Sequence, residues 1–215
     1  MKIEKIINLL FPPILLRIFF FIRNYKLRNP NCLFEGDDAL FKEEIKNVDV
    51  YGEYGCGKTT KWVLNNTSAN VIADDTSSEW IAAVKNDIVS SSRLDINYTN
   101  LGKTVGYGYP VSFEKIEYFS DYTDYIWKQN KRPELVLVDG RFRVCCFLSC
   151  LKYADVGTKI IFDDYTDRPH YHFVEKYVQR VKEFRRQCLF VVPSKSELNM
   201  VELDKDIVSF RNVMD

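Results

Sequence analysis

The chain alternates short apolar runs with stretches of helical patterning. Apolar runs predict strands at residues 48–51, 70–73, 96–98, 134–139, 159–163 and 188–192. Helices are predicted at residues 37–46, 59–64, 78–88, 142–153 and 171–184, and residues 201–210 are expected to pair at a sheet edge. Continuous apolar strands are typical of parallel strands covered on both faces. Strands that alternate with helices therefore predict an α/β fold with a mostly parallel central sheet and helices on both faces.

Acidic residues and glycines stand where the predicted strands end. They are Gly52-Glu53, Asp74-Asp75, Asp139-Gly140 and Asp163-Asp164. In an open α/β sheet, ligands bind outside the carboxyl ends of the strands. We therefore expect the functional site at this edge of the sheet.

The composition supports one globular domain, expected to cover residues 29–215. Of the 215 residues, 46% are hydrophobic and 14% are aromatic, which excludes a mostly disordered protein. Lys and Arg number 30 together, and Asp and Glu also number 30. Because nucleic-acid binders usually carry a basic excess, the zero net charge argues against a nucleic-acid partner.

The cysteine pattern argues against a metal site. Six cysteines stand at positions 32, 56, 145, 146, 150 and 188. They lack the paired Cys-x-x-Cys spacing of a zinc site, so no metal is expected. Cys145 and Cys146 lie in an apolar run, which favours buried free thiols. Free thiols are typical of a reducing compartment, so we expect a cytoplasmic protein.

Residues 1–28 differ from the rest of the chain. They hold six basic residues and one acid around an apolar run that contains Arg17 and is interrupted by Pro12-Pro13. A spanning helix needs about 20 apolar residues, more than this run supplies. The composition instead predicts a helix in the membrane interface, at the inner face of the cytoplasmic membrane. The alternative is a helix that caps the domain's own core.

The segment Gly52–Thr59 fits two patterns with different chemistry. As GxxxxGK[ST] after a strand, it predicts a phosphate (Walker A) loop in which Lys58 reaches the phosphates and Thr59 holds magnesium. That pattern indicates a P-loop nucleotide hydrolase or kinase. As acid-x-Gly-x-Gly, residues 53–57 resemble the first loop of class I methyltransferases, which bind S-adenosylmethionine (SAM).

The second pattern explains more of the surrounding sequence. Glu53 would repel phosphates but suits the cationic groups of SAM, and glycines let the backbone approach a ligand closely. Asp75 lies 18 residues beyond Gly57, near the spacing at which Rossmann sites place a ribose-binding acid. The residues therefore favour SAM, and the nucleotide alternative stays open.

Four stretches together resemble a family of class I SAM-dependent methyltransferases encoded among bacterial polysaccharide (capsule or O-antigen) biosynthesis genes. The stretches are residues 53–60, 75–80, 101–110 and 138–145. Asp-Gly-Arg-Phe-Arg at 139–143 and Arg-Pro-His-Tyr at 168–171 are the most specific segments. Lys58 and Lys103 depart from the family, which has a small residue and a proline there. The resemblance implies a Rossmann-like SAM-methyltransferase fold with SAM as the cofactor.

The resemblance also assigns roles to residues at the strand ends. The cofactor-binding residues would be Glu53, Gly55, Gly57, Asp75 and Trp80. The candidate proton acceptors are Asp139, Asp164 and His170. The candidate substrate-binding cations are Arg141, Arg143 and Arg168, which would clasp a phosphate or carboxylate.

Each role has a structural alternative. The glycine loop can be a plain turn, Trp80 a core residue and Asp139 a helix N-cap. The arginines can pair with the neighbouring acids Asp163, Asp164 and Asp167.

The expected function is transfer of a methyl group to an oxygen of a sugar or glycan precursor in cell-surface polysaccharide biosynthesis. The substrate would be a small molecule or a lipid-linked sugar. Two alternatives remain: a P-loop nucleotide hydrolase or kinase, and a non-catalytic binding member of the same fold.

Overall fold

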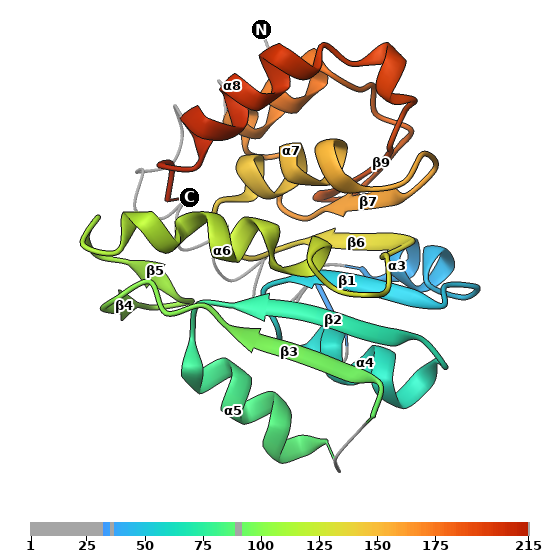
Figure 1. The fold of residues 1–215 in the computed structure, drawn as a ribbon. Coiled ribbons are helices and arrows are strands. Elements are labelled where there is room, and N and C mark those ends of the chain that lie inside the picture. Colours follow the sequence, from blue (N-terminus) through green and yellow to red (C-terminus); the bar gives the residue numbers. More distant parts are fainter. Residues whose placement is uncertain (1–31, 35–36, 89–91, 215) are drawn as a thin grey trace, which may run out of the picture. The chain divides into compact units, whose positions relative to one another are not determined.

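A seven-stranded sheet forms the centre of the computed structural model, which describes residues 32–34, 37–88 and 92–214 (Figure 1). The strands are β1 (Val50–Tyr54), β2 (Asn70–Asp75), β3 (Leu94–Tyr98), β6 (Leu135–Val138), β7 (Lys159–Phe162), β8 (Lys182–Phe184) and β9 (Gln187–Val191). Their order across the sheet is β3-β2-β1-β6-β7-β9-β8. The first five are parallel, and β9 runs antiparallel to both of its neighbours. The predicted mostly parallel sheet is confirmed.

Helices cover both faces of this sheet, as predicted. The α-helices are α3 (Ala39–Glu44), α4 (Lys58–Asn66), α5 (Ser78–Asp87), α6 (Phe119–Asp124), α7 (Arg143–Tyr153) and α8 (Met200–Phe210). The 3₁₀ helices are η1 (Ile116–Tyr118), η2 (Tyr125–Trp127), η3 (Pro169–Lys176) and η4 (Lys195–Glu197). In Figure 1, α6 lies in front of the sheet and α4 lies behind it. A small hairpin, β4 (Thr104–Val105) with β5 (Tyr109–Pro110), stands beyond the carboxyl ends of β2 and β3.

The core lies where β6, β7 and β9 pack against α7. Strand β6 is buried along its whole length, as its apolar run predicts. The ring of Phe147 in α7 stacks on Phe162 at 5.7 Å and meets Phe190 edge-on at 4.9 Å. Cys145 and Cys146 are buried in the same helix, as their apolar neighbours predict.

Two predicted elements near the C-terminus are wrong. Residues 171–184 do not form one helix: η3 ends at Lys176, and β8 forms a hairpin with β9. The two-residue turn of this hairpin carries Arg185 at φ +59°, where sequences usually signal a turn with Gly or Asn. Residues 201–210 belong to helix α8 and not to an edge strand, because Leu203 and Ile207 bury one helical face.

The N-terminal segment predicted to bind a membrane, residues 1–28, lies outside the described residues. Across the described part of the chain, none of the helices combines the length and the hydropathy that crossing a bilayer requires.

Candidate functional site

The turn after β1 is shaped by glycines that allow close backbone contact. Gly55 has φ +88° and donates its N–H to the Asp74 carbonyl at 2.9 Å. A Cβ at Gly55 would lie 2.9 Å from the Cα of Gly140, which follows β6. A Cβ at Gly57 would have no described heavy atom within 4 Å. The turn is therefore tightly packed at Gly55 and open at Gly57, where a ligand can approach the backbone.

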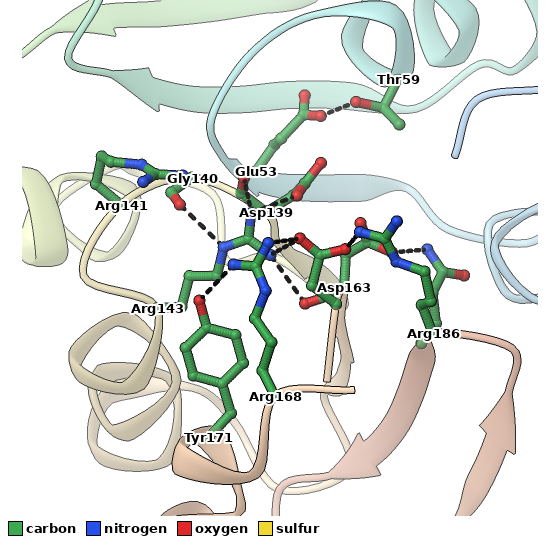
Figure 2. Close-up of polar contacts among 12 residues, drawn as sticks. Glu53, Thr59, Asp139, Gly140, Arg141, Arg143, Asp163, Arg168, Tyr171 and Arg186 are labelled. Carbon is green, nitrogen blue, oxygen red and sulfur yellow. Dashed lines mark hydrogen bonds and ion pairs between the residues drawn. The ribbon is translucent and has the colours of Figure 1, made fainter. Parts of the chain in front are cut away.

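Glu53 lies inside β1 and has no exposed surface. Its carboxyl group accepts hydrogen bonds from the hydroxyls of Thr59, and of Thr60 at 2.6 Å, in the first turn of α4. Burial raises the pKa of Glu53 to about 8. These hydrogen bonds connect Glu53 of β1 to the start of α4 (Figure 2). One of the two donors, the Thr59 hydroxyl, is the group that a phosphate loop would use to bind magnesium.

The two acids at the end of β2 point to different partners. Asp75 accepts the N–H of Cys56 on Oδ2 and the N–H of Ser77 on Oδ1, both at 2.7 Å. Asp74 instead accepts hydrogen bonds from Thr99 at 2.7 Å and Asn97 at 3.2 Å. Burial raises the pKa of Asp74 to about 8 and also raises the pKa of Asp75. The Asp75 carboxylate is therefore held on both oxygens by backbone N–H groups of the turns that follow β1 and β2.

Helix α5 begins three residues after Asp75 and carries Trp80 in its first turn. The Ser77 side chain accepts the N–H of Trp80 at 3.3 Å and so caps the start of the helix predicted from residue 78. Trp80 is 43% exposed, so it is not a core residue. Lys58, the first residue of α4, is also exposed.

Three guanidinium groups surround the acids at the ends of β6 and β7 (Figure 2). Asp164 pairs with Arg168 at 2.6 Å, with Arg143 at 3.3 Å and with Arg186. Arg143 also pairs with the Asp139 carboxylate at 2.9 Å. Since Asp164 is buried, these pairs supply the charge compensation that a buried carboxylate requires.

Arg143 also holds the backbone of this edge together. It is 4% exposed and donates hydrogen bonds to the carbonyls of Asp139, Gly140 and Asp163 at 2.9–3.0 Å. Burial raises the pKa of Asp163, and the Asp139 charge adds to that effect. The Asp163 carboxyl accepts a hydrogen bond from Gln187 at 3.0 Å.

Two residues near the same strand ends have a left-handed backbone conformation. Phe142 has φ +52° just before α7, and Asp164 has φ +59° just after β7. Neither is glycine, and such left-handed residues cost about 1–3 kcal/mol each unless their surroundings compensate. Strained residues of this kind are typical of functional sites.

The remaining predicted residues lie at the rim of this region. His170 is exposed, with its ring 4.3 Å from that of Tyr171. Arg168 donates a hydrogen bond to the hydroxyl of Tyr171 at 3.0 Å. Arg141 donates its backbone N–H to the Tyr122 hydroxyl at 3.1 Å. The Nε of Arg141 has no hydrogen-bond partner among the described residues.

Comparisons with known proteins identify the architecture. No family model and no curated protein matches this chain. Among solved structures, the chain is similar to a methyltransferase-like protein from Silicibacter pomeroyi, with 26% identity and a TM-score of 0.66 over 78% of this chain and 91% of that one. The domain has the fold of the SAM-dependent methyltransferases. It is also similar to the N-methyltransferase NodS from Bradyrhizobium japonicum in complex with S-adenosyl-L-homocysteine (SAH), with 11% identity and a TM-score of 0.50 over 76% and 90% of the two chains, a likeness of fold alone.

This methyltransferase fold brings the predicted cofactor residues to one edge of the sheet. Glu53, Gly55 and Gly57 lie at the end of β1, and Asp75 lies at the end of β2. Asp139 and Gly140 follow β6 directly and contact the β1 turn. The roles assigned to these residues stay predictions.

Sequence reasoning missed several residues at this edge. Thr60 and Tyr122 have no motif that marks them; the structure shows that the Thr60 hydroxyl accepts the N–H of Gly57 at 2.9 Å. Arg186 and Gln187 were missed because their hairpin was predicted to be the end of a helix.

The acids at this edge are close enough to hold a cation. Asp139, Asp163 and Asp164 each offer an oxygen within 4.8 Å of the others. In this structure arginines 143, 168 and 186 pair with two of them. The expectation of no metal stays a prediction.

Proposed function

We propose that the domain is a SAM-dependent methyltransferase. The arrangement of Asp75 carries this proposal. Backbone N–H groups of Cys56 and Ser77 hold its carboxylate at the end of β2, where we propose that it accepts the ribose hydroxyls of SAM. Trp80, exposed on the following helix, would flank the adenine ring.

The residues of the β1 turn fit the cationic part of the cofactor. The open backbone at Gly57 leaves room for it. Glu53 is buried beneath the turn, so we propose that it acts on the cofactor through its charge. A bound cation would favour the ionised form of a carboxyl whose pKa burial has raised to about 8.

The same features weigh against a phosphate loop. The hydroxyl of Thr59, the magnesium ligand in that pattern, donates to Glu53. The ionised form of Glu53 would oppose phosphate binding at this turn. A lysine beside a cationic cofactor would be unfavourable, but Lys58 is exposed and its side chain can extend into solvent.

We propose that the acceptor is a hydroxyl of a sugar or glycan precursor. SAM supplies a methyl group on a good leaving group, so the protein mainly orients the acceptor and removes its proton. Asp139 suits proton removal, because its side chain is 36% exposed and lies just after β6. Asp164 is buried and pairs with three guanidinium groups, which leaves it less accessible to an acceptor hydroxyl. His170 is a second exposed candidate.

Arg141 is the best placed of the three predicted arginines to bind an anionic group of the acceptor. Its Nε is buried without a hydrogen-bond partner in the described structure. Arg143 and Arg168 are engaged with Asp164. A phosphate or carboxylate of a lipid- or nucleotide-linked sugar would satisfy the Arg141 guanidinium.

A transfer assay tests this function. The purified protein is incubated with SAM carrying a radioactive methyl group and with nucleotide-linked and lipid-linked sugar fractions from a bacterial cell envelope. We expect label in a sugar fraction, and alkali-stable label would indicate an ether. If SAH binds but no fraction is labelled, the non-catalytic alternative is favoured. If the protein hydrolyses ATP and leaves SAM unused, the proposal is wrong.

A further inference from the structure

A pocket lies beside the edge strand β3, apart from the residues proposed to bind SAM. Its volume is about 370 Å³. Its walls come from the end of β3, from η1 and from the segment α6–η2. None of the five residues proposed to bind the cofactor lines it. The pocket is therefore separate from the residues proposed to bind the cofactor.

Both aromatic and polar side chains line the pocket. Tyr98 is 42% exposed and Tyr118 is 48% exposed, so both present ring surface to solvent. Tyr125 is anchored by its hydroxyl, which donates to Asp95 at 2.5 Å. Asn100 is anchored by its side-chain oxygen, which accepts the N–H of Gly102 at 3.0 Å. Exposed rings held beside fixed amide groups form a surface that is apolar and hydrogen-bonding at once.

The charged residues of the pocket narrow the choice of ligand. Lys115 lies over the ring of Tyr118, with its Nζ 6.0 Å from the ring centroid. Lys128 pairs with Asp121 at 3.4 Å. One acid against two lysines leaves a small positive excess. A lining that includes two lysines and an aspartate does not match a lipid tail, and it lacks the basic stripe that a nucleic acid requires.

We infer that this pocket binds a sugar ring of the acceptor glycan other than the ring that is methylated. A pyranose has one apolar C–H face, which matches a tyrosine ring, and a rim of hydroxyls, which matches amide and lysine groups. The positive excess favours a sugar that carries a carboxylate or a phosphate. This inference rests on the proposed function in one respect: the glycan bound in the pocket is also the methyl acceptor.

Hydrogen bonds connect the pocket to the proposed cofactor site. Asn97 lines the pocket and donates to the Asp74 carboxylate at 3.2 Å. Thr99 also lines it and donates its backbone N–H to the Asp75 carbonyl at 3.0 Å. A glycan held here would therefore lie beside the end of β2, the strand that carries Asp75.

An array of bacterial cell-surface polysaccharide fragments tests the inference. We expect the wild-type protein to bind a subset of acidic fragments. Tyr118→Ala should weaken that binding about tenfold, because it removes the ring. Tyr118→Phe keeps the ring and should keep most of the binding. Tyr107→Ala serves as the matched control, because Tyr107 is 79% exposed and lies outside the pocket.

SAH binding, measured on the same preparations, separates the two proposals. If SAH binds and no fragment binds, or if fragments bind equally well to Tyr118→Ala, the pocket inference is wrong and the proposed function stands. If fragments bind through Tyr118 and SAH does not bind, the pocket inference stands and the proposed function fails.

Discussion

Glu53 shows how far a single residue can be understood from sequence. The acid-x-Gly-x-Gly spacing predicts an acid beside the glycine turn, and the acid lies there. Its complete burial was not predictable, because the apolar run suggested that the strand ends at residue 51, whereas β1 continues to Tyr54. The extra residues place Glu53 inside the sheet, where the hydroxyls of Thr59 and Thr60 hold it.

This burial predicts a pH dependence of stability. Glu53 has a pKa of about 8 in the folded protein and about 4.5 when unfolded, so between these values the folded state holds a proton that the unfolded state releases. The free energy of unfolding should therefore fall as the pH rises from about 5 to 8, by at most about 1.4 kcal/mol per unit from this group. Urea unfolding across this range should show a shallower decline for Glu53→Gln.

Asp74 has a similarly raised pKa, so part of the decline should remain in the Glu53→Gln variant. Glu117→Gln changes an exposed acid and should unfold like the wild type at every pH. If the free energy of unfolding fell equally steeply with pH in Glu53→Gln and in the wild type, Glu53 would be ionised in the folded protein and this prediction would be wrong.

Asp139 is the residue on which proton removal is proposed to depend. Asp139→Asn keeps an oxygen for Arg143 but removes the base, so we expect kcat for methyl transfer to fall about 10²–10⁴-fold. SAH affinity should change little. Asp155→Asn, on an exposed loop, is the control. Loss of SAH affinity with kcat unchanged would assign Asp139 to cofactor binding.

At the scale of elements, the site depends on the contact between the turn after β1 and the turn after β6. A Cβ at Gly140 would lie 2.0 Å from the Tyr122 hydroxyl oxygen and 2.8 Å from the backbone nitrogen of Gly55. Gly140→Ala should therefore destabilise the domain by about 1–3 kcal/mol in urea unfolding. Gly106→Ala, where a Cβ meets no described atom within 4 Å, should change stability by less than about 0.5 kcal/mol. Equal stability of the two variants would mean that the turns do not pack together.

The elements that the sequence predicts best are those that carry a clear local signal. The apolar run before Asp139 gives β6, and Ser77 marks the start of α5. The β8–β9 hairpin was missed because Arg185 and Arg186 form its turn without Gly or Asn. Helix α8 was mistaken for a strand because apolar residues on its exposed face, such as Val201 and Val208, obscure the helical period.

At the scale of the whole molecule, parallel strands bring residues distant in sequence to one edge. The spacing from Gly57 to Asp75 predicts that pair because a single helix separates β1 from β2. The contact of Arg186 with Asp164 was not predictable, because it needs the antiparallel insertion of β9 beside β7. Spacing along the sequence thus predicts the proposed cofactor residues. The cluster of Arg143, Arg168 and Arg186 around Asp164 can be recognised only once the strand order is known.

Residues 1–28 should determine whether the protein binds membranes. We expect the full chain to pellet with liposomes that contain anionic lipid, and the protein lacking residues 1–28 to stay in the supernatant. Binding should weaken at high salt, since basic residues supply part of the attraction. Neutral liposomes are the control. Equal pelleting of both proteins would contradict a membrane role for this segment.

Calorimetric titration of SAH and of ATP with magnesium tests the central claim most directly. We predict that SAH binds the wild type and Lys58→Ala with similar affinity, and that Asp75→Ala, which lacks the acceptor for the ribose hydroxyls, loses the binding. We predict no heat of binding for ATP with magnesium. Binding of ATP with magnesium that disappears in Lys58→Ala, with no response to SAH, would contradict the account.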